Sequence, residues 1–520
     1  MARVGSLGPA LLASVALVAF GAHSVSAQQF SCPRKGGELV FGQEAKVNSF
    51  DSHASATIST RNIAMNIYET LLTRDENFNP VLDLASAIDT AADGKTHVFK
   101  LRQGVKFHNG KPMTSADVAA SFERYKKVGV ERAMLDVVEK WETPDPATFV
   151  LRMKAAQPTF LENLSSFLVP IVIIPAEHAE NPAMQLTPVG TGPFQYVEFV
   201  PDSHARLKRF DGYSPNTAFK DLDGFSGYKV ACLDTVTFRI VTEPAARAAG
   251  IETGELHAVE DIPAKSRETL SKNKNVQIKE WKNFWIQLAE VNAGFPPTDN
   301  LKFRQATMAA LDMDEVMEAA SDGAYRLNFG LQYPGQAAYS EAGKGTYNQK
   351  NPAKAKQLLA EAGYKGEEVI IIASSQIAGV KAQAEVMAEQ LKAAGMKVRV
   401  DMYDSPGYIA KSQQPEGWSV YVGEFGLAPS IGPYGLPNFW TGPKNLQKFR
   451  DPLLDTAFDE LKSKLTLAER KAAADRFYTR VTDQAYAVKL GDNGLLQAVR
   501  SEVKNFKPYR IPRAWGVWLD

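Results

Sequence analysis

The segment from residue 351 to residue 402 constrains the fold most, because its pattern predicts helices that alternate with strands. A first helix ends at Gly363, and the apolar run 369–373 then predicts a buried strand. A second helix ends at Gly395, and residues 398–402 alternate between apolar and polar as a strand does. Strand, helix and strand within about 35 residues form a crossover unit whose strands pair in parallel. We therefore expect an α/β protein with parallel pairs in at least one sheet.

Other elements have equally local signals. Residues 38–42 predict a buried strand that opens the fold, and residues 148–153 alternate as a second strand would. Thr114 to Asp117 is a capping-box pattern at the start of a helix, and Thr466 with Glu469 forms another.

Size and charge limit the classes of protein. The 520 residues predict two or three domains, and 44% hydrophobic with 23% charged residues argues against a mainly disordered chain. Lys plus Arg and Asp plus Glu both number 59, so no long-range basic field is expected. We expect no nucleic-acid partner.

The first 27 residues predict a secretory signal peptide. Arg3 precedes an apolar run at 7–22, and small residues lead to a cleavage point after Ala27. A membrane anchor would need about 20 apolar residues. A lipoprotein signal would need small apolar residues before Cys32, where Gln29-Phe30-Ser31 stands. We expect a periplasmic protein whose mature chain has no membrane span.

Export changes the interpretation of the two cysteines. In an oxidising compartment, two lone cysteines favour a pair over free thiols. We predict a Cys32–Cys232 disulfide that ties the N-terminal strand to the domain holding Cys232. Two unconnected thiols are the alternative.

No motif for catalysis or metal binding stands out. The seven histidines show no ligand spacing, and no Cys-x-x-Cys is present, so no metal is expected. Gly190-Thr191-Gly192 is followed by Pro193 and Phe194 where a dinucleotide loop would begin a helix, so it predicts a turn. A nucleophile elbow and a phosphate loop are also missing from the sequence. We expect no cofactor, and binding rather than catalysis.

Aromatic residues gather in two places. Asn283-Phe284-Trp285 precedes a strand-like stretch that ends at Asn292. A loop rich in Gly and Pro, 423–443, carries four more rings: Phe425, Tyr434, Phe439 and Trp440. Long loops inside compact domains are usually functional, and rings among glycine backbone suit a pocket for an organic ligand. Alternatively, these rings plug the base of the loop.

Seven stretches together resemble one protein family. The longest is 100–118, with Arg102-Gln103-Gly104, His108-Asn109-Gly110 and the capping box; the others are 66–71, 190–194, 254–256, 303–306, 311–312 and 358–364. Taken in chain order, they resemble the peptide, dipeptide and nickel class of extracytoplasmic solute-binding proteins of ATP-driven importers. In the long stretch, two tight turns are expected around a short strand, with His108 bonding a turn rather than a ligand.

The resemblance implies a two-lobed, type II periplasmic binding protein fold with mixed sheets and an interlobe hinge. Lobe I would comprise 28–59, 190–280 and 491–520, with an inserted subdomain at 60–189, and lobe II would comprise 281–490. The lobes would close over a ligand without a covalent step, and the closed form would deliver it to the permease subunits of the importer. A monomer is expected.

One departure from the family concerns the ligand. Peptide-binding members typically carry an acid before a Pro that pairs with the peptide's α-ammonium, and here Ala428 stands at that place. A buried ammonium without its partner would cost about 3 to 5 kcal/mol. Either Glu424 substitutes, or the ligand has no ammonium there. An opine-like, sugar-like or aromatic solute is therefore considered beside a short peptide, and nickel is disfavoured because no His cluster would hold it.

The predicted ligand-binding residues are Glu44, Trp285, Arg326, Glu424, Phe425, Tyr434 and Trp440. Arg326 would pair with a ligand carboxylate, or alternatively form a surface ion pair, and Glu44 could pair with a nearby Lys or Arg instead. Two rival functions stay open: a secreted hydrolase acting on peptides or glycosides through an unrecognised carboxylate pair, and a periplasmic chaperone.

Overall fold

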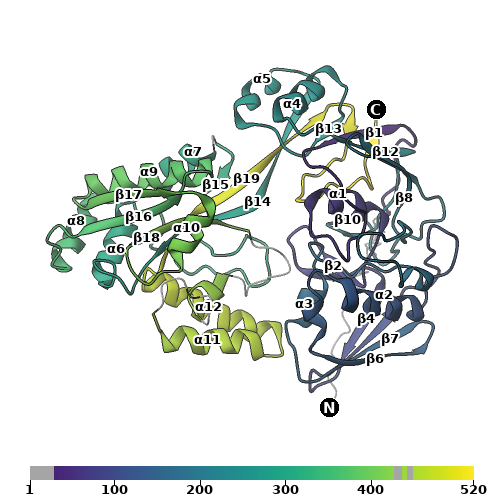
Figure 1. Ribbon diagram of the computed structural model, residues 1–520, viewed down its shortest axis with the longest axis horizontal. Helices are drawn as coiled ribbons and strands as arrows, with labels where there is room; N and C mark the ends of the chain where they lie inside the picture. The colour runs from purple at the N-terminus through teal and green to yellow at the C-terminus, as the bar shows by residue number, and fades with distance from the viewer. Residues whose placement is uncertain (1–28, 322, 427–435, 442–444, 446–448) are drawn as a thin grey trace, which may run out of the picture.

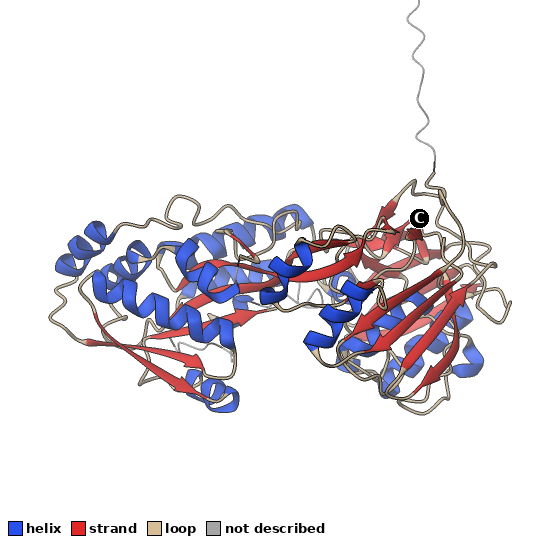
Figure 2. Ribbon diagram, turned by 90° about the horizontal axis from the view of Figure 1, so that it is seen from above, coloured by secondary structure: helices blue, strands red, loops and turns tan. Residues whose placement is uncertain are grey.

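Two bodies lie side by side, joined by a pair of long strands (Figures 1 and 2). The computed structural model describes residues 29–321, 323–426, 436–441, 445 and 449–520. The predicted signal peptide lies outside the described residues. We call the residues before the first joining strand, with those after the second, the N-terminal body. The residues between the two joining strands are the C-terminal body.

Eleven strands of the described chain form one mixed sheet that runs through both bodies, in the order β17-β16-β18-β14-β19-β13-β1-β12-β9-β8, with β15 added beside β19. Their bounds are β1 (Glu38–Gln43), β8 (Phe194–Val200), β9 (His204–Arg209), β12 (Thr235–Ile240), β13 (Ala258–Val259), β14 (Val276–Val291), β15 (Tyr325–Arg326), β16 (Glu368–Ser374), β17 (Lys397–Tyr403), β18 (Val420–Phe425) and β19 (Ala487–Arg500).

The joining strands are β14 and β19, which pair antiparallel along most of their length. At one end β19 pairs with β13 in the N-terminal body, and at the other β14 pairs with β18 in the C-terminal body. The β14–β19 ladder shifts register between Trp281 and Trp285 and again between Gln287 and Leu288. Such bulges bend a strand and increase its twist, so the sheet changes direction where the bodies meet.

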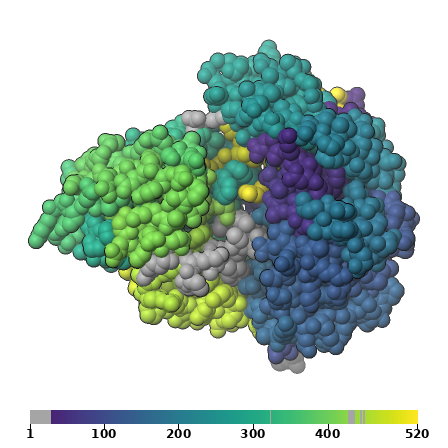
Figure 3. Space-filling model, viewed as in Figure 1, coloured from purple at the N-terminus to yellow at the C-terminus, as the bar shows by residue number. Residues whose placement is uncertain are grey.

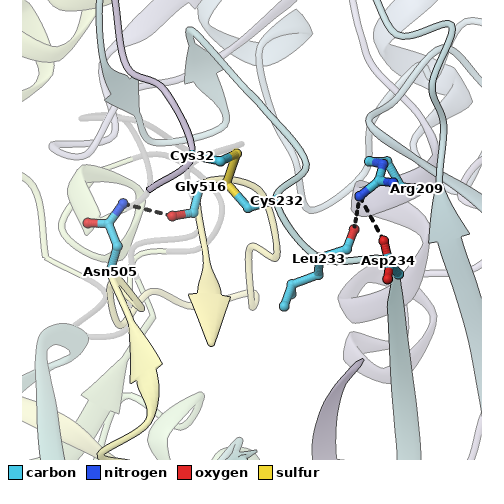
Figure 4. Close-up of a disulfide and its surroundings, with 7 residues drawn as sticks. All are labelled: Cys32, Arg209, Cys232, Leu233, Asp234, Asn505 and Gly516. Carbon is cyan, nitrogen blue, oxygen red and sulfur yellow. Dashed lines mark hydrogen bonds and ion pairs between the residues drawn. A yellow bond between two sulfur atoms is a disulfide. The ribbon is translucent and has the colours of Figure 1, made fainter. Parts of the chain in front are cut away.

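The predicted opening strand is confirmed as β1, which lies between β12 and β13 and is parallel to both. A strand paired on both sides must bury its apolar residues, and Leu39 and Phe41 are almost fully buried. The predicted disulfide between Cys32 and Cys232 is also confirmed, and it fixes the chain just before β1 to the chain just before β12 (Figure 4).

A separate four-stranded antiparallel sheet belongs to the N-terminal body, in the order β4-β5-β7-β6: β4 (Ala85–Thr90), β5 (Thr96–Leu101), β6 (Val138–Asp145) and β7 (Thr148–Met153). It packs with α2 (Ser115–Val128), which begins at the predicted capping box. Phe99, Phe122 and Phe149 lie in a hydrophobic core of their own beneath this sheet.

The crossover unit predicted for 351–402 is confirmed in the C-terminal body. Asn351 caps α8 (Pro352–Glu361) through the Lys354 amide, and Gly363 and Gly395 take positive φ after their helices. Strands β16 and β17 pair in parallel around α9 (Ala378–Ala393). The second predicted capping box, at Thr466 and Glu469, begins α12 (Leu467–Asp483).

The remaining described helices are α1 (Ile58–Ile67), α3 (Phe160–Leu164), α4 (Pro244–Thr253), α5 (Arg267–Ser271), α6 (Leu301–Ala310), α7 (Met313–Ser321), α10 (Ser405–Ser412) and α11 (Pro452–Ser463). Three two-stranded ladders complete the list: β2 (Leu72–Arg74) with β3 (Pro80–Leu82), β10 (Leu222–Asp223) with β11 (Ser226–Gly227), and β20 (Val503–Lys504) with β21 (Trp518–Leu519). Among the described helices, none has the length and apolarity that a bilayer crossing requires.

The long family signature is structural, as expected. Gly104 and Gly110 take positive φ in two turns that flank the predicted short strand, where a bridge between Lys106 and Pro112 forms instead of a full strand. The amide of Gly190 donates to Nδ1 of His108, and Nε2 of His108 lies 3.0 Å from the carbonyl oxygen of Gly192. This imidazole therefore bonds the turn at 190–193, as predicted.

Candidate functional site

Trp285 lies on β14 at the bulge between the two bodies. The sequence pattern placed Asn283-Phe284-Trp285 ahead of a strand, but all three residues lie within β14. The half-buried indole meets the ring of Phe284 edge-on, with 5.2 Å between centroids, and Phe284 in turn contacts Trp281. Trp285 is therefore held by aromatic neighbours at the point where the sheet changes direction.

The C-terminal body contributes Glu424 and Gly426 to the surroundings of Trp285. Glu424 on β18 pairs with Gln287 on β14, two residues from Trp285, so the three side chains share one face of the sheet. Burial raises the pKa of Glu424, and the Gln287 side chain opposes that rise. A Cβ on Gly426 would lie 2.5 Å from Cζ3 of Trp285, so only glycine lets this backbone lie against the indole.

The N-terminal body contributes two arginines to the same region. The guanidinium carbon of Arg510 lies 5.4 Å from the ring centroid of Phe284 and 5.6 Å from that of Trp285. Arg61, on α1, is 7% exposed and donates through Nη1 to the carbonyl oxygens of Ala56 and Leu168. Its pKa is lowered to about 10, first by burial and then by the positive charge of Arg510.

We call Arg61, Phe284, Trp285, Glu424 and Arg510 the Trp285 cluster. It draws on α1, the C-terminal segment, β14 and β18, and so on both bodies. Figure 3 shows a hollow between the green C-terminal body and the purple N-terminal segment, with teal and yellow atoms at its floor. Those colours belong to the joining strands and the C-terminal segment.

Phe425 and Trp440 face the interior instead. The side chain of Phe425 points away from Glu424, as successive residues on a strand do, and contacts Phe439 and Tyr421. Trp440 is 1% exposed and its Nε1 donates to a Glu290 oxygen at 2.7 Å. In this conformation both rings pack against protein, as the alternative interpretation had it, and ligand contact by them stays a prediction.

Arg326 and Glu44 pair within the chain. Nη2 of Arg326 lies 2.6 Å from a carboxylate oxygen of Asp492, which is fully buried, and also donates to Asn283. Glu44 is half exposed, with its carboxylate 3.6 Å from Nη2 of Arg247. Glu44 thus has the intrachain partner that was its alternative to ligand contact, whereas Arg326 pairs with a buried carboxylate rather than in the surface ion pair considered for it. Ligand contact by either residue stays a prediction. Tyr434 and Ala428 lie outside the described residues.

A cavity of about 440 Å³ lies elsewhere between the two bodies. Its walls include Phe78, Asn79 and Glu162 from the N-terminal body and Gln336 and Arg470 from the C-terminal body. The ring of Phe78 contacts Trp281, which contacts Phe284, so continuous aromatic packing connects this cavity to the Trp285 cluster. Of the predicted ligand-binding residues that the structure describes, none lines the cavity.

Polar bonds join the bodies at the rim of this cavity. Arg470 on α12 lies 3.1 Å from a carboxylate oxygen of Glu162, and both side chains are nearly buried. The side chain of Asn79 accepts from the amide of Ala337 and donates to the carbonyl oxygen of Gly335. The bodies are therefore in direct contact on this side.

The chemistry of the Trp285 cluster suits binding. It offers aromatic faces, guanidinium donors and one carboxylate, which can stack on an organic molecule and hydrogen-bond its polar groups. Within the described part of the chain, no group of three or more His, Cys, Asp or Glu side chains is arranged to hold a metal ion.

Sequence patterns pointed to Trp285 and Glu424 but missed both arginines. A signal for Arg510 was present, since it stands between prolines and aromatics in Pro508-Tyr509-Arg510-Ile511-Pro512. Arg61 has no comparable signal, because it is one polar residue in an ordinary helical stretch.

Comparison with known proteins places the chain among binding proteins. Residues 79–447, more than half of the chain, match the family described as bacterial extracellular solute-binding proteins, family 5 middle. A probable peptide ABC transporter periplasmic-binding protein of Sinorhizobium fredii is 25% identical over 90% of this chain and 91% of its own. A glutathione-binding protein of Pectobacterium atrosepticum is 26% identical over 86% of this chain and 87% of its own.

A solved structure has the same fold. It is the periplasmic binding protein AgaA of A. tumefaciens R10 in complex with agropinic acid, with a TM-score of 0.65 and 25% identity over 93% of this chain and 99% of that one. The likeness extends over both bodies and the strands that join them.

Proposed function

Because this chain belongs to the bacterial extracellular solute-binding proteins of family 5, and so is the substrate-binding component of an ABC importer, we propose that it captures its solute at the Trp285 cluster. The fold is that of the two-lobed, type II periplasmic binding proteins, and the family's members are binding proteins rather than enzymes. The ligand class is a small organic solute or short peptide.

One observation carries the location of the site: Trp285 stands at the bulge of a joining strand, with groups from both bodies around it. A ligand stacked there would contact Arg510 from one body and Glu424 from the other. Contacts to both bodies stabilise the closed arrangement more than the open one, and a ligand shifts such an equilibrium only through differential affinity. Closure also removes water and so strengthens the polar contacts.

The lobes and the route to the periplasm complete the proposal. Lobe I comprises 28–59, 190–280 and 491–520, the inserted subdomain 60–189, and lobe II 281–490. The separate core beneath the four-stranded sheet supports the inserted subdomain. The first 27 residues direct export, and the mature protein works as a monomer in the periplasm with the importer's permease subunits. The Cys32–Cys232 disulfide is consistent with that oxidising compartment.

Calorimetric titration with a panel of short peptides, glutathione, agropinic acid and sugars tests the site. At least one compound should bind, and Trp285→Ala should weaken its binding about 10- to 100-fold, since an aromatic anchor commonly contributes 2 kcal/mol or more. Trp518→Ala, a half-buried tryptophan on β21, is the matched control and should leave affinity unchanged.

Two results would overturn the proposal. Equal loss of affinity in Trp285→Ala and Trp518→Ala would show that the ligand does not bind at the Trp285 cluster. Turnover of a peptide or glycoside that disappears when one carboxylate is changed would favour the secreted hydrolase.

A further inference from the structure

Buried arginines in this protein are held in two different ways. Some pair with a carboxylate: Arg124 lies 2.6 Å from an oxygen of Asp51, and Arg513 lies 2.6 Å from one of Glu76. Arg304 has no carboxylate partner in the described chain, but its Nε and Nη1 donate to three backbone carbonyl oxygens. Each of these arginines is therefore satisfied inside the protein.

Arg61 and Arg510 are satisfied less completely. The Nε of each is buried and has no hydrogen-bond partner. Within the described residues, neither guanidinium forms an ion pair with a carboxylate, although a guanidinium presents five donors in all. Arg61 uses only Nη1, and Arg510 rests against the rings of Phe284 and Trp285.

The two positive charges also repel each other. The pKa of Arg61 is lowered by burial and by Arg510, and burial lowers the pKa of Arg510 as well. Arg61 is buried and Arg510 half-buried, and among the described residues no carboxylate offsets their desolvation and mutual repulsion, which destabilises the fold. A negative group placed between them would reverse both effects.

We propose that Arg61 and Arg510 receive an anionic group of the solute, so that the substrate is an organic carboxylate with an apolar or planar body that stacks on Trp285. This inference rests on the proposed function and names its substrate class. A carboxylate is planar and singly charged and matches the edge of a guanidinium through two parallel hydrogen bonds. The adjacent rings accept the rest of the molecule.

Matched acid and amide probes test the carboxylate requirement. Calorimetry would compare hippurate with hippuramide and glutathione with its diethyl ester, and would include agropinic acid and phenyl phosphate. The acid of at least one pair should bind at least 10-fold more tightly than its uncharged partner. Arg510→Gln should weaken that acid about 10- to 100-fold, the usual effect of losing a hydrogen bond to a charged group.

Control variants separate this role from a structural one. Arg510→Lys keeps the charge and should retain part of the preference for acids, whereas Arg239→Gln, which removes an exposed pair with Glu255, should have no effect. Arg61→Gln should weaken the same acid, and the melting temperature of each variant checks that it folds.

Several results would overturn the inference. Uncharged partners that bind as tightly as the acids, or an Arg510→Gln variant with unchanged affinity, would end it while leaving the proposed function in place. Phenyl phosphate binding with no carboxylate binding would replace the substrate class. If no carboxylate probe binds, the inference is also overturned. Only if the uncharged compounds do not bind either would the result count against the proposed function.

Discussion

One half-buried histidine, His108, joins two segments that lie more than eighty residues apart. His108 accepts from the amide of Gly190, so its own proton is on Nε2, which donates to the carbonyl of Gly192. Burial lowers its pKa to about 4, because the protein would have to accommodate an imidazolium with little water around it. The neutral ring is therefore the form that the fold requires.

His108 should make the protein less stable in mild acid. In the unfolded chain His108 takes up a proton below pH 6.5, whereas in the folded protein it does so only near pH 4. The stability that the neutral ring contributes is therefore complete above pH 6.5 and is lost as the pH falls toward 4. At pH 5 the loss is about 2 kcal/mol. Urea denaturation at pH 7.5 and pH 5 measures it.

The variant His108→Gln isolates this contribution. Glutamine keeps one donor and one acceptor but does not titrate, so its free energy of unfolding should fall by about 2 kcal/mol less than that of the parent between the two pH values. His204→Gln, at the start of β9, is the matched control and should follow the parent. Equal falls for the parent and His108→Gln would contradict the assignment.

Site residues differ in how far a sequence can reveal them. Trp285 stands out through the local density of aromatic rings, whereas Glu424 stands out only through the resemblance, as a substitute for the acid that is missing at Ala428. Arg61 and Arg510 stand out only through missing partners, which depend on every neighbour in three dimensions. For Phe425 the deciding fact is the register of β18, which turns its side chain inward while Glu424 faces Trp285.

Among the elements, helix ends can be predicted from the local sequence, whereas the order of strands in the sheet cannot. Caps at Asn351 and Thr466 are local hydrogen bonds within a few residues, so the sequence predicts them directly. Strand β14 was predicted only in part, because its bulge at 281–285 breaks the alternation that identifies a strand. Its partner β19 lies about 200 residues later, and no local pattern encodes such a pairing.

The disulfide should stabilise the N-terminal part of the large sheet. Cys32 and Cys232 are separated by 200 residues, and each lies just before one of the paired strands β1 and β12. The bond removes freedom from the unfolded chain, so Cys32→Ser with Cys232→Ser should lower the free energy of unfolding by about 2 to 5 kcal/mol. Urea denaturation of both proteins measures the loss.

Reduction provides the control for the disulfide. Dithiothreitol should bring the parent close to the double variant and leave the double variant unchanged. An unaltered parent, with reduction of the bond verified by thiol titration, would show that the unfolded chain gains little freedom and that packing around β1 holds the segment.

At the scale of the whole molecule, the balance between open and closed arrangements depends on contacts between the bodies. Glu162 and Arg470 form an ion pair across the cavity rim, with 13% and 10% of their side chains exposed. Arg470 also donates to the carbonyl oxygens of Lys464 and Leu465, which fixes it at the start of α12. A pair so well shielded from water favours the arrangement in which the bodies touch.

Glu162→Gln should therefore shift the protein toward separated bodies. The amide carries no charge, so the ion pair is lost and the fraction of protein in the closed arrangement falls. The apparent affinity for the ligand falls in proportion to that fraction, by about 10-fold for each 1.4 kcal/mol of lost closure free energy. Small-angle scattering should give a larger radius of gyration for the unliganded variant, and calorimetry should give the weaker binding. Glu268→Gln, which removes the exposed pair with Lys272, should change neither quantity. A variant with the parent's radius but weaker binding would place Glu162 at the ligand rather than at the rim, whereas unchanged values of both would show that β14 and β19 alone set the angle between the bodies.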